Sequence, residues 1–548
     1  MKRKIEELWK GLYPNSVKEL DEVFKCLDYE KGKQGVLKND VCENWNKNSV
    51  IYSLYVDLFA ENFQNLKEKI PYLLELGINT IWILPCLSSP MRDQGFDIEN
   101  YRTIRNELGT NHDFYDFINC LHKNGIRIIF DMGINHTSDQ HQWFKNARTS
   151  KDAEYRDFYI FNKDTDKYKD ARLIFKGMVN CNWEYNKDTD DYYFHRFYEF
   201  QPDLNYKNPK VLLEILKIFL YWQEKGVDGF RLDAIPFIWK EENTECENLK
   251  NVHVIIKIFR LCMDYVRKGT VFISEANILP NHVKEYFGTG DECQLAYHFP
   301  LMPKFFLAQA EKNYEYIFET LSEDITPIIP KSCEWISFLR CHDELTLEYA
   351  TVKERELMNK YYLKDAKYSF REGEGIAGRL INLMDHDIKR VLNLYALLFS
   401  NIGVPIIYYG DEIGLTNDLE FFENFSRKTG YKDARFVNRG NMKWEIAEKR
   451  LTTGTKENII FSSLKNLISL RKKINVFFDN APILKKEEDK SIFRISRIFE
   501  NQKLDIIINL SDENKVVKIE KGKDLITNQK FSDEINLSPF GYVWLLCE

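Results

Sequence analysis

Short apolar runs alternate along this chain with segments of helical periodicity. Most of the runs are continuous, a pattern typical of parallel strands buried on both faces. Helical patterns lie between them, for example at Phe63–Leu76, Asn111–Asn124 and Asn208–Lys225. Eight strands separated by helices predict an α/β fold, a (β/α)8 or TIM barrel. The predicted strands are Val50–Leu58, Thr80–Pro85, Arg127–Asn135, Gly229–Ala234, Thr270–Ala276, Gln294–Phe299, Trp335–Asp343 and Val404–Gly410.

Three parts of the chain depart from this alternation. Residues 1–45 are charged and helix-like, which predicts an N-terminal helical cap on a catalytic barrel of residues 46–475. About 90 residues separate the third predicted strand from the fourth, too many for a simple loop, so a small inserted domain is expected at 137–205. From Ser491 onward the apolar positions alternate, and residues 478–548 are expected to form a C-terminal antiparallel β-domain.

The composition excludes several partners. The chain has 548 residues, 77 basic against 84 acidic side chains and a net charge of −7, so it has no basic footprint for nucleic acid. We find no run of apolar residues long enough to cross a membrane and no secretory signal at the N-terminus. The 11 cysteines are scattered without a CxxC pair, which favours reduced thiols and a cytoplasmic protein.

Two carboxylates end neighbouring predicted strands. Asp233 closes Gly229-Phe-Arg-Leu-Asp233, and Glu275 closes Val271-Phe-Ile-Ser-Glu275. The C-terminal ends of barrel strands form the catalytic face of such folds. A pair of carboxylates there is what retaining glycoside chemistry needs, one as nucleophile and one as acid and base.

Other polar groups follow the same strand ends. His136 follows the third strand, and His342 and Asp343 follow the seventh. Each motif alone has a structural alternative: Arg231 and Asp233 as an ion pair, each histidine as a core residue, Asp343 as a helix cap. Their joint placement at one end of the barrel favours a catalytic site over these separate explanations.

Together these segments resemble the signature regions of the α-amylase superfamily, glycoside hydrolase family 13, over about residues 45 to 475. The resemblance implies that Asp233 is the nucleophile and Glu275 the general acid and base. It implies that Asp343 is a third carboxylate that stabilises the transition state. Arg231 resembles the arginine that orients the nucleophile. No cofactor is implied.

The resemblance also implies a sugar-binding set. His136 and His342 resemble the two histidines that hold the hydroxyls of the glucosyl unit. Asp93 and Arg439 resemble an ion pair that closes the non-reducing end of the pocket in the oligo-1,6-glucosidase-like branch, which acts on small α-glucosides. Phe96 stands where a tyrosine usually stacks on that glucose, and it keeps the stacking face while losing one hydroxyl.

Longer similar segments indicate which branch of the α-amylase superfamily the chain resembles. Similarity to trehalose synthases runs through Glu275–Gly288, Gly290–Pro303 and Phe338–Glu348, and includes Asp170–Phe175 and Thr244–Asn248. The first 60 residues and Leu415–Trp444 look more like amylosucrase. Two departures stand out. Cys341 occupies the place of a usual asparagine, and the loop Phe59–Phe63 lacks the oxygen ligands of a calcium site, so no metal is expected.

We therefore expect a retaining, exo-acting α-glucoside transglucosidase and hydrolase that interconverts maltose and trehalose, as in trehalose synthase. The alternatives are an amylosucrase-like sucrose glucosyltransferase and an oligo-1,6-glucosidase-like α-glucosidase that hydrolyses short α-glucosides. A non-catalytic transporter ectodomain would have lost its carboxylates, and a nucleotide-dependent transferase would need a glycine-rich phosphate loop, which is not found.

Overall fold

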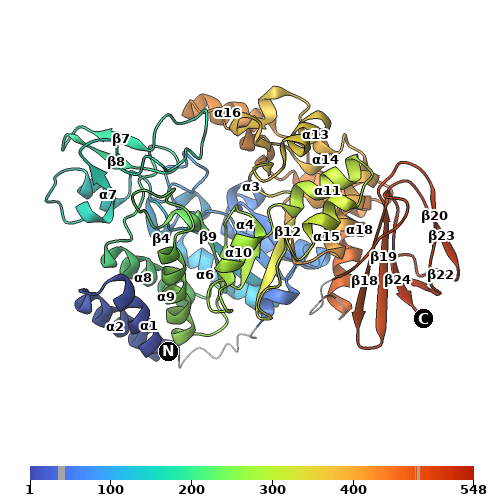
Figure 1. The fold of residues 1–548 in the computed structure, drawn as a ribbon, viewed down its shortest axis with the longest axis horizontal. Helices are drawn as coiled ribbons and strands as arrows, with labels where there is room; N and C mark the ends of the chain where they lie inside the picture. The colour runs from blue at the N-terminus through green and yellow to red at the C-terminus, as the bar shows by residue number, and fades with distance from the viewer. Residues whose placement is uncertain (35–43, 475–476, 478–481) are drawn as a thin grey trace.

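A closed barrel of eight parallel strands forms the centre of the molecule (Figure 1). The computed structural model describes residues 1–34, 44–474, 477 and 482–548. The predicted (β/α)8 fold is confirmed, with every predicted strand region contributing one barrel strand. In barrel order the strands are β1 (Ile51–Leu54), β16 (Val404–Tyr408), β12 (Glu334–Phe338), β11 (Leu295–Tyr297), β10 (Val271–Ser274), β9 (Gly229–Asp233), β5 (Arg127–Gly133) and β2 (Thr80–Ile83).

Strand β9 lies between β5 and β10, with Arg231 in register with Asp131 on one side and Ile273 on the other. Its first residue has to be small. A Cβ atom on Gly229 would lie 3.0 Å from the carbonyl oxygen of Val271, tighter than most real contacts. The glycine therefore lets β9 and β10 approach each other closely at the first residue of β9. Asp233 is the last residue of the same strand, at its C-terminal end.

Helices surround the barrel because their apolar stripes pack on its outer face. Helix α8 begins with Asn208, whose side chain accepts a hydrogen bond from the Lys210 backbone, followed by Pro209 in the first turn. Both are favoured helix starts. The covering helices are α6 (Asn111–Lys123), α8 (Pro209–Glu224), α9 (Lys250–Val266), α11 (Leu301–Ala310), α15 (Ile388–Ser400) and α18 (Lys456–Lys473).

Several element boundaries differ from the prediction, and at two of them the kind or number of elements changes. The segment expected as one helix, Phe63–Leu76, is two helices, α4 (Phe63–Glu68) and α5 (Ile70–Leu76). Pro71 explains the break, since it lacks the N–H that a continuous helix would use and fits only the first turn of α5. The strand expected at Val50–Leu58 stops at Leu54 and continues as helix α3 (Val56–Ala60).

The long segment between β5 and β9 carries its own small sheet. Strands β6 (Phe161–Asn162), β8 (Asp191–Phe194) and β7 (Trp183–Asn186) pair antiparallel, after helix α7 (Gln142–Ala147). Figure 1 places this sheet at one end of the molecule, away from the C-terminal strands. A second short sheet follows β12 and joins β13 (Leu345–Thr346), β15 (Gly375–Ile376) and β14 (Ser369–Phe370). Helices α10 (Pro280–Val283), α12 (Glu315–Thr320), α13 (Val352–Tyr362), α14 (Leu380–Leu383), α16 (Leu419–Thr429) and α17 (Trp444–Ala447), with strands β3 (Leu87–Ser88) and β4 (Asn100–Ile104), complete the connections.

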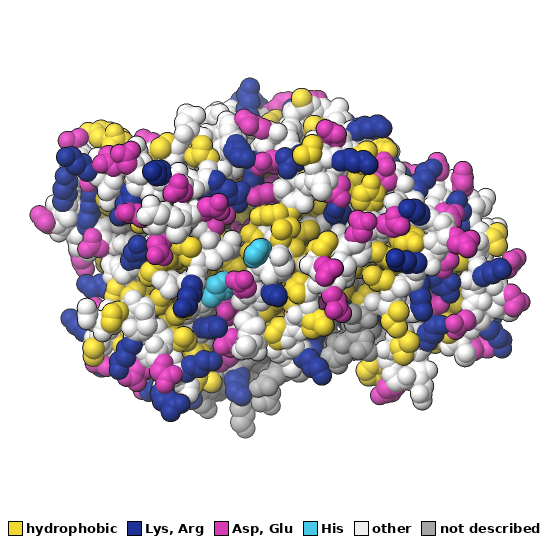
Figure 2. Space-filling model, in the orientation of Figure 1, with side chains coloured by type: hydrophobic (Ala, Val, Ile, Leu, Met, Phe, Trp, Pro, Cys, Tyr) yellow, Lys and Arg dark blue, Asp and Glu magenta, His cyan; other side chains and the backbone are white. Residues whose placement is uncertain are grey.

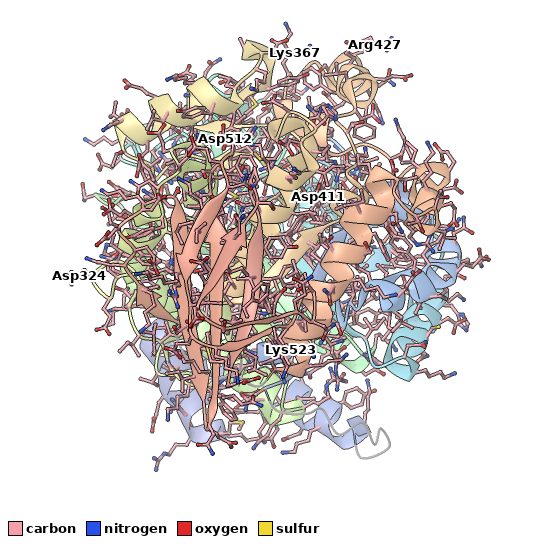
Figure 3. All side chains as sticks on the ribbon, turned by 90° about the vertical axis from the view of Figure 1, so that its right-hand side faces the viewer. Asp324, Lys367, Asp411, Arg427, Asp512 and Lys523 are labelled. Atoms are coloured by element: carbon pink, nitrogen blue, oxygen red, sulfur yellow. The ribbon has the colours of Figure 1, made fainter. Side chains whose placement is uncertain are left out.

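Both ends of the chain pack on the barrel. Helices α1 (Lys2–Leu12) and α2 (Val17–Gln34) contact α9, and α2 also contacts α8. The C-terminal segment forms antiparallel sheets, as predicted, and β19 contacts α15. Figure 3 faces the larger sheet, with Asp512 and Lys523 toward its opposite ends. Its strands are β17 (Ile483–Lys485), β18 (Ile492–Phe499), β19 (Gln502–Asn509), β24 (Tyr542–Cys547), β21 (Gly522–Asp524) and β22 (Lys530–Phe531), and the smaller pair is β20 (Lys515–Lys518) and β23 (Glu534–Leu537).

The expected domain boundary at 475–478 lies largely outside the described residues. Among the residues that the structure describes, no helix combines the length and the apolar character needed to cross a membrane.

Candidate active site

A pocket opens at the C-terminal ends of the barrel strands. Figure 2 shows hydrophobic side chains and histidine at the surface over the region where Figure 1 shows α10, whereas the histidines that line the pocket, His136 and His342, are each only 2% exposed. The pocket brings together eight of the nine predicted site residues, from segments far apart in the sequence. They are Asp93, Phe96, His136, Arg231, Asp233, Glu275, His342 and Asp343.

One guanidinium connects two of the carboxylates. Arg231 Nη1 donates to Asp233 and lies 3.0 Å from Asp131 Oδ1, while its Nη2 lies 3.5 Å from Glu275 Oε1. Burial alone would disfavour the charged form, but Asp131 and Asp233 raise the pKa of Arg231 well above its usual value. Arg231 is therefore a fixed positive charge that lies between Asp233 and Glu275.

Glu275 has a different environment from Asp233. Its Oε2 accepts a hydrogen bond of 2.9 Å from the backbone N–H of Ala234, directly after β9. Burial, with a further contribution from the charge of Asp233, raises the pKa of Glu275 to about 8, although Arg231 opposes this shift. At neutral pH Glu275 therefore carries a proton that it can give to a ligand.

The third carboxylate, Asp343, lies among two arginines and a histidine. Arg435 Nη1 and Arg439 Nη2 lie 3.1 and 3.2 Å from Asp343 Oδ1, and His342 Nε2 lies 3.1 Å from Oδ2. Burial opposes ionisation, but His342, Arg435 and Arg439 together lower the pKa of Asp343. The site thus combines a protonated Glu275 with an ionised Asp343.

Asp93 pairs with a different arginine from the one expected. Its Oδ1 lies 3.7 Å from Arg435 Nη2, and Gln201 donates to its Oδ2 at 3.0 Å. The expected Asp93–Arg439 pair is wrong in this structure, and Arg439 does not line the pocket. The reason is that Arg439 Nε donates to the carbonyl oxygen of His342 at 2.8 Å, which turns its guanidinium toward Asp343. Burial raises the pKa of Asp93 to about 7, although the charges of Arg435 and Arg439 act to lower it.

Aromatic and histidine side chains form the floor of the pocket. Phe96 stacks on the His342 ring, with ring centroids 5.4 Å apart and planes 17° from parallel. His136 is buried, its Nε2 has no hydrogen-bond partner, and its Nδ1 lies 3.3 Å from the side-chain amide nitrogen of Asn135. A free ring nitrogen and an aromatic face are features that a sugar can use, through a hydroxyl and a ring face respectively.

Ion pairs connect the segments around the pocket mouth. Arg172, from the segment between β5 and β9, lies 2.7 Å from Glu348 and 2.8 Å from Glu247. Asn277 donates to Glu348 at 2.9 Å, and Arg371 lies 3.1 Å from the same carboxylate. All five line the pocket. We call these five residues the rim network, which joins four loops over the site.

The rim network and Arg435 were not assigned by sequence reasoning. All of them except Arg371 lie in segments similar to trehalose synthases or amylosucrase, yet each reads by itself as a surface charge or, for Asn277, as a surface polar residue. The sequence carried one indication that these residues act together, because trehalose synthases resemble the chain in all three of the segments Asp170–Phe175, Thr244–Asn248 and Phe338–Glu348. Long loops bring them into contact, and residue spacing along the chain does not predict such contacts.

The fold and the pocket together define the class of (β/α)8-barrel enzymes that act on glycosidic bonds. Comparison with known proteins specifies the family. The pattern for the α-amylase catalytic domain matches residues 60–477. The chain therefore belongs to the α-amylase family, glycoside hydrolase family 13, as the sequence motifs indicated.

Curated relatives cover most of the chain. The trehalose synthase/amylase of Mycolicibacterium smegmatis is 42% identical over 383 residues, which is 68% of this chain and 64% of that protein. The chain thus matches less than two thirds of the length of that relative. The oligo-1,6-glucosidase of Parageobacillus thermoglucosidasius is 29% identical and aligns over 89% of this chain and 95% of its own. Among solved structures, a trehalulose synthase mutant has a TM-score of 0.74 at 23% identity, covering 92% of this chain and 99% of that chain.

Proposed function

We propose that this protein is a retaining, exo-acting transglucosidase that interconverts maltose and trehalose, with some hydrolysis. The observation that carries the proposal is the rim network over a pocket that contains three carboxylates. Arg172, Asn277 and Arg371 all contact Glu348 in the lining of that pocket. A covered pocket favours transfer because it keeps water out and retains the released sugar.

The carboxylates support a double-displacement mechanism. In retaining enzymes the two catalytic carboxyl groups lie close together, and here one guanidinium contacts both Asp233 and Glu275. Asp233 is proposed to attack the anomeric carbon while Glu275 protonates the glycosidic oxygen, so the C–O bond to the leaving glucose breaks as the bond to Asp233 forms. Asp343 is proposed to bind ring hydroxyls more tightly in the transition state than in the ground state.

The second step decides the product. Glu275, now a carboxylate, takes a proton from an incoming hydroxyl as the Asp233 ester bond breaks. If the released glucose has turned within the covered pocket, its anomeric hydroxyl attacks and maltose becomes trehalose. If water attacks first, two glucose molecules leave. The ratio of transfer to hydrolysis therefore depends on how well the pocket excludes water.

The far end of the pocket supports exo action. Asp93, Arg435 and Asp343 are linked by charge contacts at this end, and Gln201 adds a hydrogen bond to Asp93. We propose that this wall limits the site to one terminal glucosyl unit. The substrates we propose are therefore short α-glucosides, with maltose and trehalose first, as the names of the relatives at about 40% identity suggest. Sucrose and other short oligosaccharides are the alternative donors.

We also propose that residues 137–205 act as an inserted domain that completes the pocket. Arg172, Phe175 and Phe197 from this stretch line the pocket. A cytoplasmic site of action is proposed on the ten described cysteines, all of which are free thiols.

A product analysis tests the proposal. The purified protein is incubated separately with maltose, trehalose and sucrose, with Asp233→Asn as the blank, and the sugars are identified by NMR. Trehalose from maltose, and maltose from trehalose, is the expected result. Hydrolysis alone, which gives only glucose from maltose and trehalose and equal amounts of glucose and fructose from sucrose, would make the protein an α-glucosidase. Fructose with a new glucoside from sucrose would favour the amylosucrase-like alternative.

A further inference from the structure

Three consecutive residues on one wall of the pocket offer metal-binding atoms to a common point. Cys341, His342 and Asp343 each contribute one such atom, and these atoms lie within 4.8 Å of one another. All three residues line the pocket. In the part of the chain that the structure describes, no other group of three or more His, Cys, Asp or Glu side chains is close enough together to hold one ion.

The side chains are buried but not fully satisfied. Cys341 and His342 are 5% and 2% exposed, and His342 Nδ1 has no hydrogen-bond partner. The backbone N–H of Asp343 lies 3.4 Å from the Cys341 sulfur, which keeps the thiol beside the carboxylate. His342 Nε2 lies 3.1 Å from Asp343 Oδ2, so this nitrogen and the carboxylate are close enough to share one ion while Nδ1 carries the proton of the ring.

We propose that Cys341, His342 and Asp343 form an inhibitory site for a thiophilic divalent cation, with Zn²⁺ or Cd²⁺ as the class of ion. Sulfur, imidazole nitrogen and carboxylate oxygen are the ligands that Zn²⁺ takes in proteins, and three protein ligands leave a fourth position for water. On binding, the thiol proton passes to solvent as the sulfur–metal bond forms. The asparagine usual at this position in the family would supply no thiolate, so the site is a property of this chain.

The cation would compete with the sugar. It would engage Asp343 and His342, the groups that the proposed function, on which this part of the inference rests, assigns to the glucosyl hydroxyls. A bound ion would also compete with Arg435 and Arg439 for the negative charge of Asp343, and it would bind His342, the ring on which Phe96 stacks. Inhibition that glucose relieves is therefore expected, while ion binding itself does not depend on the substrate assignment.

Cobalt(II) is the direct probe, because a cobalt–thiolate bond gives a charge-transfer absorption that colourless Zn²⁺ lacks. The wild-type protein is titrated with Co²⁺, beside Cys341→Ser, Cys341→Asn and the control Cys181→Ser, which removes an exposed thiol. Zn²⁺ is then used to displace Co²⁺ and, separately, to inhibit each protein, with inhibition expressed relative to the uninhibited rate of the same variant. Circular dichroism checks the fold of each variant.

The wild type and Cys181→Ser are expected to give the thiolate band and equal Zn²⁺ inhibition. Both Cys341 variants should lose the band and need about 10–100-fold more Zn²⁺, at least the loss typical of a damaged metal site. A band that survives in folded Cys341→Asn, or that disappears in Cys181→Ser, would overturn the proposal. If the band depends on Cys341 but glucose does not relieve the inhibition, the metal site stands and the assignment of Asp343 and His342 to sugar hydroxyls fails.

Discussion

At the scale of single residues, the site separates the protonation states of carboxylates that lie in one pocket. Burial beside Asp233 raises the pKa of Glu275 to about 8, whereas the charges around Asp343 lower its pKa despite burial. Environments that push pKa values apart assign acid and base roles. Arg435 and Arg439 contact Asp343 and favour its ionised form, whereas Arg231 opposes the raised pKa of Glu275.

The nucleophile assignment gives the first prediction. Asp233→Asn should lower kcat on maltose by about 10⁴-fold or more, because the amide cannot form the covalent glucosyl ester. Asp188→Asn, on an exposed side chain of the inserted segment, is the control and should leave the rate unchanged. Steady-state rates with matched circular dichroism spectra measure both. A folded Asp233→Asn protein with a tenth of the wild-type rate would rule out this nucleophile.

The raised pKa of Glu275 gives the second prediction, which concerns the pH dependence of the rate. Glu275 acts in its protonated form, so kcat/KM should fall as the pH rises through about 8 and drop about tenfold for each further pH unit. In Glu275→Gln this alkaline limb should disappear, and an aryl α-glucoside with a good leaving group should lose less activity than maltose does. An unchanged alkaline limb in the Gln variant would assign the acid to another group.

At the scale of elements, the strand ends were predictable and the loops were not. A buried parallel strand reads as a continuous apolar run, so the positions of Asp233 and Glu275 at strand ends followed from the sequence. The break between α4 and α5 had a local signal in Pro71 that the periodicity of the segment hid. The early end of β1 at Leu54 had no comparable signal, since the residues of α3 are also apolar.

The rim network gives a prediction for one loop. Arg172→Ala should remove its pairs with Glu247 and Glu348 and raise the fraction of maltose that is hydrolysed by about fivefold, equivalent to roughly 1 kcal/mol for a partly exposed pair. Lys176→Ala, which removes a nearby pair with Glu374 but no residue of the pocket lining, is the matched control. Chromatography gives the ratio of glucose to trehalose. An equal ratio of glucose to trehalose in both variants would show that the rim network does not keep water out of the pocket.

The start of α8 gives a prediction about stability. Asn208→Ala should lower the free energy of unfolding by about 1 kcal/mol, because the Lys210 backbone N–H loses its side-chain acceptor. Asn208→Asp, which keeps a capping oxygen, should stay within a few tenths of the wild-type value. Urea denaturation followed by circular dichroism measures both, and equal stability of Ala and Asp variants would show that the cap contributes nothing there.

At the scale of the whole molecule, the site is assembled from the ends of the barrel strands and from the long segments that follow β5, β12 and β16. The sequence predicted the barrel, the C-terminal antiparallel strands and the three carboxylates, because these rest on local patterns and specific motifs. It did not predict Arg435 beside Asp93, since two arginines four residues apart are equivalent along the chain. Only folding shows that the His342 carbonyl oxygen holds Arg439, which leaves Arg435 to reach Asp93.

The most direct test of the central claim follows the glucose that leaves the pocket. Maltose is converted by the purified protein in the presence of excess free glucose labelled with ¹³C, and the trehalose formed is analysed by mass spectrometry. A covered pocket that retains its glucose predicts trehalose without label. Trehalose that carries label in proportion to the free glucose would contradict retention, and glucose as the sole product would contradict the transglucosidase itself.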